Sequence, residues 1–180
     1  MTARFCLRCG AALRTRREGG KARRACPRCG WTFYGNPVPA AVAALVRGDR
    51  VLLSRRARPP HAGTWDLPGG FLEAGETPEG ALRRELAEEL GIRVGAVRLL
   101  GAYPDRYGPG GAPVLTMVFE AGPGQGRMTA KDDVSEARWF PLAALPLREI
   151  AFPSVRAALR ALIARRRSAR RARARRVRGR

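Results

Sequence analysis

The segment from Gly70 to Ile92 constrains this chain most, because it gathers acidic residues on one loop and one short helix. Thr77 and Pro78 have the preferences of a helix N-cap and of the first helical position. Gly91 stands where a glycine often ends a helix. Between these ends leucine recurs at every fourth residue, which predicts a helix with one buried face.

Three carboxylates, Glu85, Glu88 and Glu89, fall within about one turn of this predicted helix. Like charges at this spacing weaken a helix that has no partner for them. Hard divalent cations such as Mg²⁺ take oxygen ligands and pair naturally with phosphate substrates. The glycine-rich stretch DLPGGFLEAGE before the helix can also bring backbone carbonyls close to a cation. The segment therefore predicts a divalent metal site.

The pattern G-x5-E-x7-R-E-apolar-x-E-E-x-G-apolar is the Nudix box, and the chain resembles the Nudix hydrolases over about residues 38–163. This resemblance implies an α/β/α sandwich around a mixed sheet. It also implies hydrolysis of a pyrophosphate bond in a nucleoside diphosphate linked to another moiety, with Mg²⁺ or Mn²⁺. An exposed amphipathic helix that carries surface charge is the alternative. The fixed positions of the box are Gly70, Glu76, Arg84, Glu85, Leu86, Glu88, Glu89, Gly91 and Ile92.

The resemblance also implies roles for individual residues. Glu85 and Glu89 match metal ligands, and Glu88 matches a residue that binds the metal or helps to activate water. Arg84 matches a supporting position of the site, and Gly70 matches a source of a carbonyl ligand. A bound divalent ion lowers the pKa of a coordinated water, so direct attack by water is the simplest mechanism.

Four cysteines stand in two C-x-x-C pairs, Cys6 with Cys9 and Cys26 with Cys29, and sixteen residues separate the pairs. This spacing predicts a closed four-cysteine structural zinc site. Disulfides are the alternative, but the N-terminus lacks the apolar region of a secretory signal. We therefore expect a reducing, cytoplasmic location. The zinc ribbon is expected to pack against the rest of the chain or to mediate a homodimer contact, and otherwise to help bind nucleic acid or substrate.

A four-cysteine ribbon before a Nudix box resembles the NADH pyrophosphatase branch of the family. That branch carries an SQPWPFPxS-like array shortly after the box, whereas this chain reads RVGAVRLLGAYPDRYGPGG there. The substrate therefore stays open among NADH, ADP-ribose and similar molecules.

The order of the predicted elements favours an α/β fold with three parts. We expect a zinc ribbon in residues 1–36, a Nudix domain in 37–164, and a basic, disordered tail in 165–180. The longest apolar stretch, 38–46, is too short to cross a membrane. Strands are predicted at 38–46, 50–55, 64–67, 94–103, 114–121 and 136–140, and a second helix at 153–164.

The net charge of +20 is concentrated at the two ends of the chain. Residues 1–36 carry nine basic side chains and one acidic one, and residues 165–180 carry ten arginines and no acid. Such a tail attracts RNA or another polyanion. Two alternatives to a small-molecule hydrolase follow. One is a nucleic-acid-binding protein that uses the ribbon and the tail, and the other is a hydrolase acting on the capped 5′ end of RNA.

Residues outside the box complete the predicted site. Arg55 and Arg106 are candidates to bind phosphate, although ordinary solvated arginine is the alternative. Tyr107 and Trp65 are candidates to stack on a nucleobase, although core packing fits Trp65 better. Glu136 is the candidate for a catalytic base or a further metal ligand from beyond the box, with surface charge as its alternative.

Overall fold

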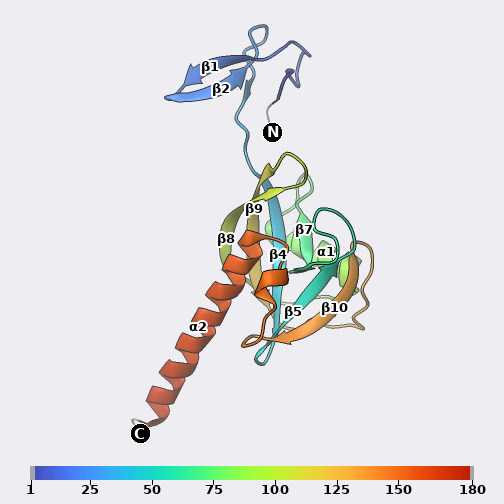
Figure 1. The fold of residues 1–180 in the computed structure, drawn as a ribbon, viewed down its shortest axis with the longest axis vertical. Coiled ribbons are helices and arrows are strands. Elements are labelled where there is room, and N and C mark those ends of the chain that lie inside the picture. The colour runs from blue at the N-terminus through green and yellow to red at the C-terminus, as the bar shows by residue number, and fades with distance from the viewer. Residues whose placement is uncertain (1–2, 179–180) are drawn as a thin grey trace.

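The computed structural model describes residues 3–178, and it forms a small N-terminal lobe, a larger main domain and one long projecting helix (Figure 1). We call residues 3–33 the ribbon and residues 38–178 the main domain. The elements in chain order are β1 (Arg14–Glu18), β2 (Lys21–Ala25), β3 (Thr32–Phe33), β4 (Val38–Arg47), β5 (Arg50–Arg56), β6 (Trp65–Asp66), β7 (Gly69–Phe71), α1 (Pro78–Leu90), β8 (Val97–Tyr107), β9 (Ala112–Ala121), β10 (Val134–Pro141), a 3₁₀ turn (Leu147–Glu149) and α2 (Pro153–Arg178).

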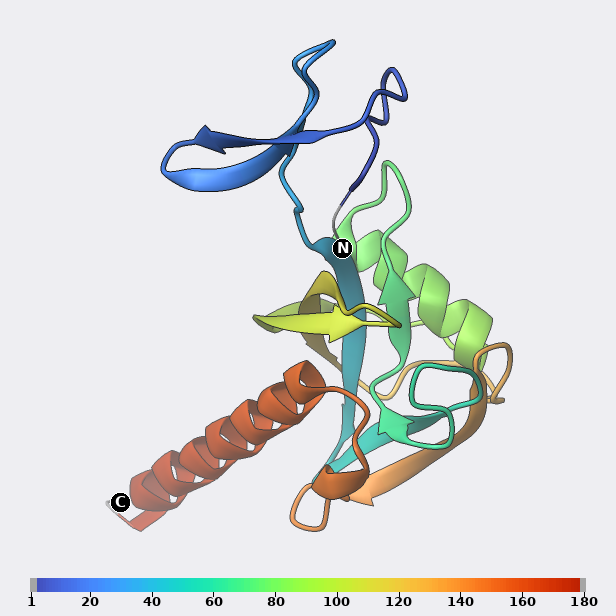
Figure 2. The same ribbon diagram turned by 45° about the horizontal axis from the view of Figure 1, so that its top comes forward.

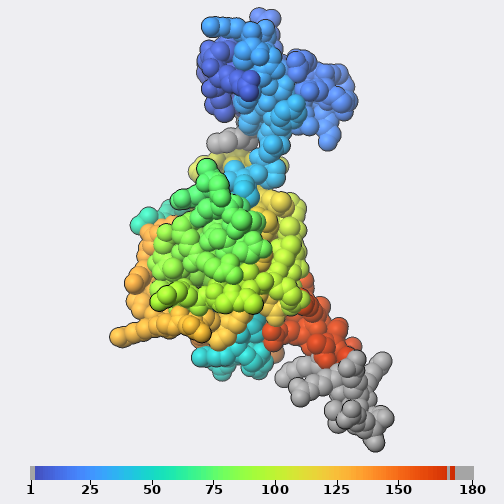
Figure 3. All heavy atoms as spheres, turned by 180° about the vertical axis from the view of Figure 1, so that it is seen from behind, coloured from blue at the N-terminus to red at the C-terminus, as the bar shows by residue number. Residues whose placement is uncertain are grey.

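The ribbon is a three-stranded antiparallel sheet with very little apolar core. Its order is β1-β2-β3, and Arg14 pairs with Ala25 at one end of the β1–β2 hairpin. Its core cluster holds three buried residues, Cys6, Leu13 and Cys26. A narrow neck joins the ribbon to β4, so it stands apart from the main domain as a separate lobe (Figure 3).

The main domain is built on a mixed sheet. The strand order is β10-β5-β4-β9-β8, with β6 paired to β5 and β7 paired to β4. β4 and β9 run parallel over their length, so that Val38 pairs with Val114 and Leu45 with Ala121. The remaining pairs are antiparallel. The mixed sheet agrees with the prediction.

Both faces of this sheet are covered, as alternation along β4 shows. Val42, Ala44 and Val46 belong to the apolar cluster that includes the buried face of α2. The residues between them, such as Ala43 and Leu45, belong to the cluster that includes the leucines of α1. Successive side chains of a strand point to opposite faces, so α1 and α2 cover opposite sides of the sheet (Figure 2). The predicted α/β/α sandwich is confirmed.

Two strand predictions differ from the structure. The stretch around Gly69 was expected to be a loop, but it forms β7 and pairs with β4. Gly69 has φ 132°, and a Cβ there would collide with the backbone of Ala41, so only glycine allows this close pairing. The connection between the strands predicted at 94–103 and 114–121 is also shorter, because β8 continues to Tyr107 and β9 begins at Ala112.

Helix α2 continues beyond the predicted end of the second helix. Its buried face ends at Leu162, yet the helix runs on to Arg178, through the segment that composition predicted to be disordered. Alanine and arginine both favour helix, and Arg165 and Arg166 form ion pairs with Glu120 of β9. The division at residue 164 stays a prediction. Among the described residues, no helix combines the length and the apolar character needed to cross a lipid bilayer.

Candidate active site and cysteine cluster

The ends of α1 are fixed by the residues that the sequence indicated. The Thr77 side chain accepts a hydrogen bond from the backbone N–H of Gly80 at 3.1 Å, and Pro78 occupies the first turn. Gly91 adopts a left-handed conformation with φ 67°, and its N–H donates to the carbonyl of Ala87. The leucine face of α1 is fully buried against the sheet. These contacts set the rotation of α1 and therefore the direction of its glutamates.

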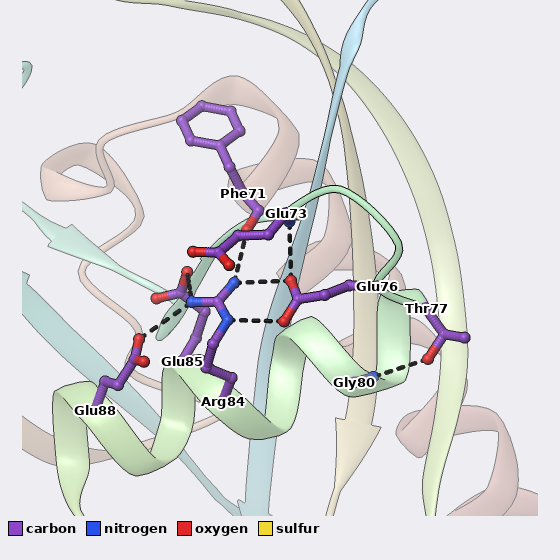
Figure 4. Close-up of polar contacts among 8 residues, drawn as sticks. All are labelled: Phe71, Glu73, Glu76, Thr77, Gly80, Arg84, Glu85 and Glu88. Atoms are coloured by element: carbon purple, nitrogen blue, oxygen red, sulfur yellow. Dashed lines mark hydrogen bonds and ion pairs between the residues drawn. The ribbon is translucent and has the colours of Figure 1, made fainter.

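Arg84 organises three of the acidic side chains around one guanidinium (Figure 4). Its Nε and Nη2 donate to the two carboxylate oxygens of Glu76 at 2.8 and 3.0 Å. Its Nη1 donates to Glu85 at 2.9 Å and to Glu88 at 3.1 Å. Nη2 also donates to the carbonyl of Phe71 at 3.0 Å. These five bonds use all the N–H donors of the side chain, so Arg84 ties α1 to the loop before it.

This network changes the protonation of its members. Hydrogen bonds from Arg84, joined by the backbone N–H of Glu73, lower the pKa of Glu76 to about 2. The bonds to Glu76 raise the pKa of Arg84 above its already high ordinary value. Burial raises the pKa of Glu85, against the opposing effect of the Arg84 guanidinium.

Glu85 and Glu89 lie against two consecutive glycines. A Cβ on Gly70 would collide with the carboxylate of Glu85, so the close approach requires glycine. The N–H of Gly69 donates to Glu89 at 2.9 Å. Glu89 is buried, and this burial raises its pKa to about 8 despite that hydrogen bond. Strand β7, which precedes α1, thus has both carboxylates next to its backbone.

Both carboxylates line a cavity of about 310 Å³, and residues at the start of α2, Ser154 and Val155, line it as well. Strand β7 and the next two residues, 69–73, form one wall, and Arg106 and Tyr107 at the end of β8 contribute another. Asp132 and Asp133, in the loop before β10, add two more carboxylates. The cavity therefore combines acids that suit a cation with cationic and aromatic groups that suit a nucleotide.

Aromatic rings enclose one end of this cavity. Tyr107 stacks on Phe152 with ring centroids 5.7 Å apart and meets the edge of Phe71 at 5.0 Å. Arg56 donates to the hydroxyl of Tyr107 at 3.2 Å and lies over the Phe152 ring. Tyr107 is thus held by three neighbours at the cavity wall.

Asp66 is a cavity residue that sequence reasoning did not assign to the site, and it lies beside Arg56, which also lines the cavity. Asp66 is buried, accepts from the N–H of Leu67 at 2.8 Å and pairs with Arg56 at 3.3 Å. Burial raises its pKa to about 6, against the attraction of Arg56. Ser54 and Arg56 stand two residues apart on β5, so they point to the same face of the sheet, and both line the cavity.

The structure does not bring every predicted site residue to the cavity. Glu88 is half-exposed on the outer side of Arg84 and does not line it. Trp65 is buried in the core, with its ring edge against Phe140. Arg55 lies over the Trp65 ring and donates to Glu136 at 3.1 Å, and Glu136 is also bonded to Arg138. Glu85, Glu89, Gly70, Arg84, Arg106 and Tyr107 do line the cavity.

The donor set suits a hard divalent cation. Glu85 and Glu89 offer carboxylate oxygens to the cavity, and the space that a Cβ on Gly70 would fill is left to the Glu85 carboxylate. Glu85 and Glu88 both turn toward Arg84, so a cation bound at Glu85 competes with this guanidinium for its oxygens.

The four cysteines converge in the ribbon. Their sulfurs lie within 4.8 Å of one another, and the pairs Cys6–Cys29, Cys9–Cys26 and Cys9–Cys29 are 3.5, 3.5 and 3.7 Å apart. A tetrahedral zinc with bonds of ~2.3 Å places its sulfurs about 3.8 Å apart, so the cluster fits that ion. Burial opposes ionisation of Cys26, but backbone N–H groups of Cys29 and Arg28 outweigh it and lower its pKa to about 6. At the neighbouring Cys29 the backbone N–H of Trp31 favours the thiolate, but burial and the adjacent sulfurs outweigh it and raise the pKa. The thiolate is therefore favoured at Cys26 and not across the whole cluster.

Comparison with known proteins gives the family. The NUDIX domain family model matches residues 37–162. The chain is 39% identical over 118 residues to an ADP-ribose pyrophosphatase of Methanocaldococcus jannaschii, which covers 64% of this chain and 69% of that protein. It is 33% identical over 146 residues to the NAD-capped RNA hydrolase NudC of Pseudomonas aeruginosa, which covers 79% of this chain but 49% of that one. The chain therefore spans about half the length of its NudC relatives.

Solved structures agree with this assignment. A NUDIX hydrolase from Nitrosomonas europaea superposes with a TM-score of 0.72 at 28% identity, covering 92% of this chain and 93% of that one. A MutT NUDIX hydrolase from Burkholderia pseudomallei gives a TM-score of 0.64 at 33% identity, covering 69% and 97%. With the glutamate-lined cavity and the match over residues 37–162, these likenesses place the chain in the NUDIX domain family.

Proposed function

We propose that this protein hydrolyses a pyrophosphate bond in a nucleoside diphosphate linked to another moiety, with a divalent metal. The observation that carries the proposal is one cavity in which Glu85 and Glu89 lie with Arg106 and Tyr107. Relatives named ADP-ribose pyrophosphatase and NAD-capped RNA hydrolase support this substrate class.

The residues of the Nudix box bind the metal in this proposal. Glu85 and Glu89 hold Mg²⁺ or Mn²⁺, which when bound lowers the pKa of a coordinated water and screens the charge of the diphosphate. Arg84 positions Glu85 and favours its ionised form against the effect of burial, because it donates to that carboxylate at 2.9 Å. Gly70 admits the carboxylate next to the loop backbone.

Arg106 and Tyr107 bind the substrate in this proposal. Arg106 donates to the carbonyl of Gly111 at 3.1 Å through Nη1, which leaves its other donors for a phosphate oxygen. Tyr107 lies between Phe71 and Phe152, so the nucleoside packs against this aromatic group. The substrate could be NADH, ADP-ribose or the capped end of an RNA, since all contain the same linkage.

The choice of a catalytic base also follows from placement. Glu136 was the candidate from the sequence, but both of its oxygens are bonded to arginines and it lies outside the cavity. Asp132 and Asp133 face the cavity from the loop before β10. They pair with the exposed Arg58 at 3.6 and 3.1 Å, contacts that substrate can displace. We favour this pair over Glu136 for the task.

The test is hydrolysis by the purified full chain with Mg²⁺ of NADH, ADP-ribose, dinucleoside polyphosphates and NAD-capped RNA. Glu89→Gln is expected to lower kcat on the order of 10³-fold, because a neutral amide replaces a metal-binding carboxylate. Glu149→Gln, an exposed acid of the 3₁₀ turn, is the control and should retain full activity. Full activity in the Glu89 variant would reject the assigned site.

A structural Zn²⁺ in the ribbon is a second part of the proposal, carried by the sulfur separations of 3.5 to 3.7 Å. Thiolates at this site suit a reducing compartment such as the cytoplasm. Metal analysis of protein purified under reducing conditions should give one zinc per chain, and its absence would remove the ribbon assignment.

The basic segment 165–180 is proposed to attract RNA or another polyanion. It begins on α2 beyond the last buried residue and carries ten arginines and no acid. Contacts of this kind release counterions, so binding should weaken steeply as salt rises. Affinity for a 5′-hydroxyl RNA that does not change between 50 and 200 mM KCl would contradict this part of the proposal.

A further inference from the structure

A second, larger groove lies where α2 leaves the sheet, and it shares no residue with the catalytic cavity. Its volume is about 710 Å³. Four arginines line it, Arg98 from β8 and Arg165, Arg166 and Arg167 from α2. Two carboxylates, Asp49 and Glu120, also line it, so the groove has an excess of two positive charges.

Three of these arginines surround Glu120. Its Oε2 accepts from Arg98 at 2.5 Å and its Oε1 from Arg166 at 2.7 Å, while Arg165 lies 3.7 Å from Oε2. A guanidinium has five N–H donors, and one carboxylate offers about four lone-pair sites. The three arginines together therefore have many more donors than Glu120 can receive.

The groove is also held rigidly at this point. Arg166 donates to the carbonyl of Gly48, in the turn between β4 and β5, at 3.1 Å. Leu162, one helical turn earlier, is fully buried against the sheet. Arg98 stands on a paired strand opposite Glu120. Because strand and helix are fixed to each other here, the guanidiniums need little further ordering to bind a ligand.

We propose that this groove binds the phosphodiester backbone of single-stranded nucleic acid, with Arg98 and Arg167 as the main phosphate donors. Glu120 positions Arg98 and Arg166 and does not itself contact the strand. A repeated anion fits better than a single phosphate, because α2 continues from the groove toward further arginines. Figure 1 shows this helix running outward from the sheet. The inference rests on the proposed affinity for polyanions and not on the hydrolase activity.

The test is fluorescence anisotropy of the full chain with a labelled 20-nucleotide RNA that has a 5′-hydroxyl end, so that no diphosphate enters the cavity. The double variant R98A/R167A is compared with R93A/R127A, which removes two exposed arginines elsewhere on the main domain. The groove variant is expected to weaken binding about tenfold at 100 mM KCl and the charge-matched control less than about threefold. The salt slope should fall by about 1.4 for two lost phosphate contacts with a single strand.

A lysine variant and a vesicle-binding assay separate the remaining outcomes. R98K/R167K keeps the charge but loses the bidentate fork, so it should fall between wild type and the alanine variant. Equal weakening by the groove and control variants would overturn the inference while leaving the polyanion proposal intact. No RNA binding by the wild type would reject both the groove inference and the polyanion proposal. Neither result would bear on the proposed hydrolase activity, which is measured separately with ADP-ribose. Tighter binding to vesicles containing anionic lipid than to RNA would also overturn the inference.

Discussion

The ribbon and the main domain are stabilised by different means. The ribbon buries three residues in its core, two of them cysteines, and carries a large excess of arginine. The main domain buries two apolar clusters, one on each face of a seven-stranded sheet. A module this small lacks the apolar area to offset the entropy of ordering its chain, so we expect the ribbon to depend on the proposed zinc. The main domain has two apolar clusters for this purpose, so the acids that line its cavity are available for chemistry.

Loss of one thiolate tests this contrast most severely. Cys26→Ser is expected to unfold the ribbon, because about 10–16 kcal/mol of apparent metal-coupled folding free energy is removed. Amide resonances of residues 3–33 should collapse to the random-coil region of a ¹H–¹⁵N spectrum, and bound zinc should disappear. Resonances of α1 and the mixed sheet should stay in place. A variant ribbon that keeps its dispersed resonances would show that the fold does not depend on the metal.

A core truncation in the main domain should show the reverse pattern. Leu86 is fully buried in the cluster beneath α1. Leu86→Ala is expected to lower the free energy of unfolding of the main domain by about 2–5 kcal/mol, because it leaves a cavity between α1 and the sheet. The change is measured by urea denaturation, with zinc content unchanged. Leu7→Ala is the control, since Leu7 lies on the ribbon and is 81% exposed. A similar loss of unfolding free energy in both variants would contradict the difference in how the ribbon and the main domain are stabilised.

The difference between these regions also explains what sequence alone could predict. The ends of α1 depend on Thr77, Pro78 and Gly91, whose preferences are local, so both ends were predicted correctly. Strand β7 depends on how closely Gly69 approaches Ala41, which is distant in sequence. Its pairing could not be predicted from its own composition.

The residues of the candidate site also fall into two groups, those that local sequence predicts and those whose place depends on tertiary packing. The positions of Glu85 and Glu89 follow from helical periodicity and from the box, and the structure places both in the cavity. The membership of Asp66 depends on packing of β5, β6 and α2 together, and its burial is a tertiary effect. The separation of Glu136 from the cavity is also tertiary, because Arg55 and Arg138 hold it on β10.

Arg84 connects the stability of the main domain with the proposed chemistry, so its replacement should change both the unfolding free energy and kcat. Arg84→Lys keeps the charge but offers three donors in place of five, and it cannot bond both oxygens of Glu76 in a fork. We expect a loss of about 1–3 kcal/mol in unfolding free energy and a fall of about 10–100-fold in kcat, which is the usual effect of losing a group that orients metal ligands.

Arg83→Lys is the matched control on the next residue of α1. Arg83 donates only to backbone carbonyls, those of Glu79 and Gly95, and lies exposed. Its replacement should change neither kcat nor the unfolding free energy measurably. If the Arg84 variant behaves like the Arg83 variant, the five-bond network does not position Glu85.

The smallest expected effect is the pH dependence that Glu76 gives to the main domain. Hydrogen bonds from Arg84 lower its pKa from an ordinary 4.5 to about 2 in the folded protein. A carboxyl group with a lowered folded-state pKa stabilises the fold above its unfolded-state pKa, and this contribution is lost as pH falls toward the folded-state value. The stabilisation by Glu76 should therefore be complete above about pH 4.5 and decline between about pH 4.5 and 2.

Glu76→Gln removes this dependence, so the difference in urea midpoint between wild type and variant should shrink as pH is lowered from 5 to 3. Glu149→Gln, which has no contact with Arg84, should leave the pH profile of the midpoint unchanged. A constant difference for Glu76→Gln across this range would mean that Arg84 does not stabilise the ionised form of Glu76. The contact of Arg84 with the loop would then rest on the Phe71 carbonyl.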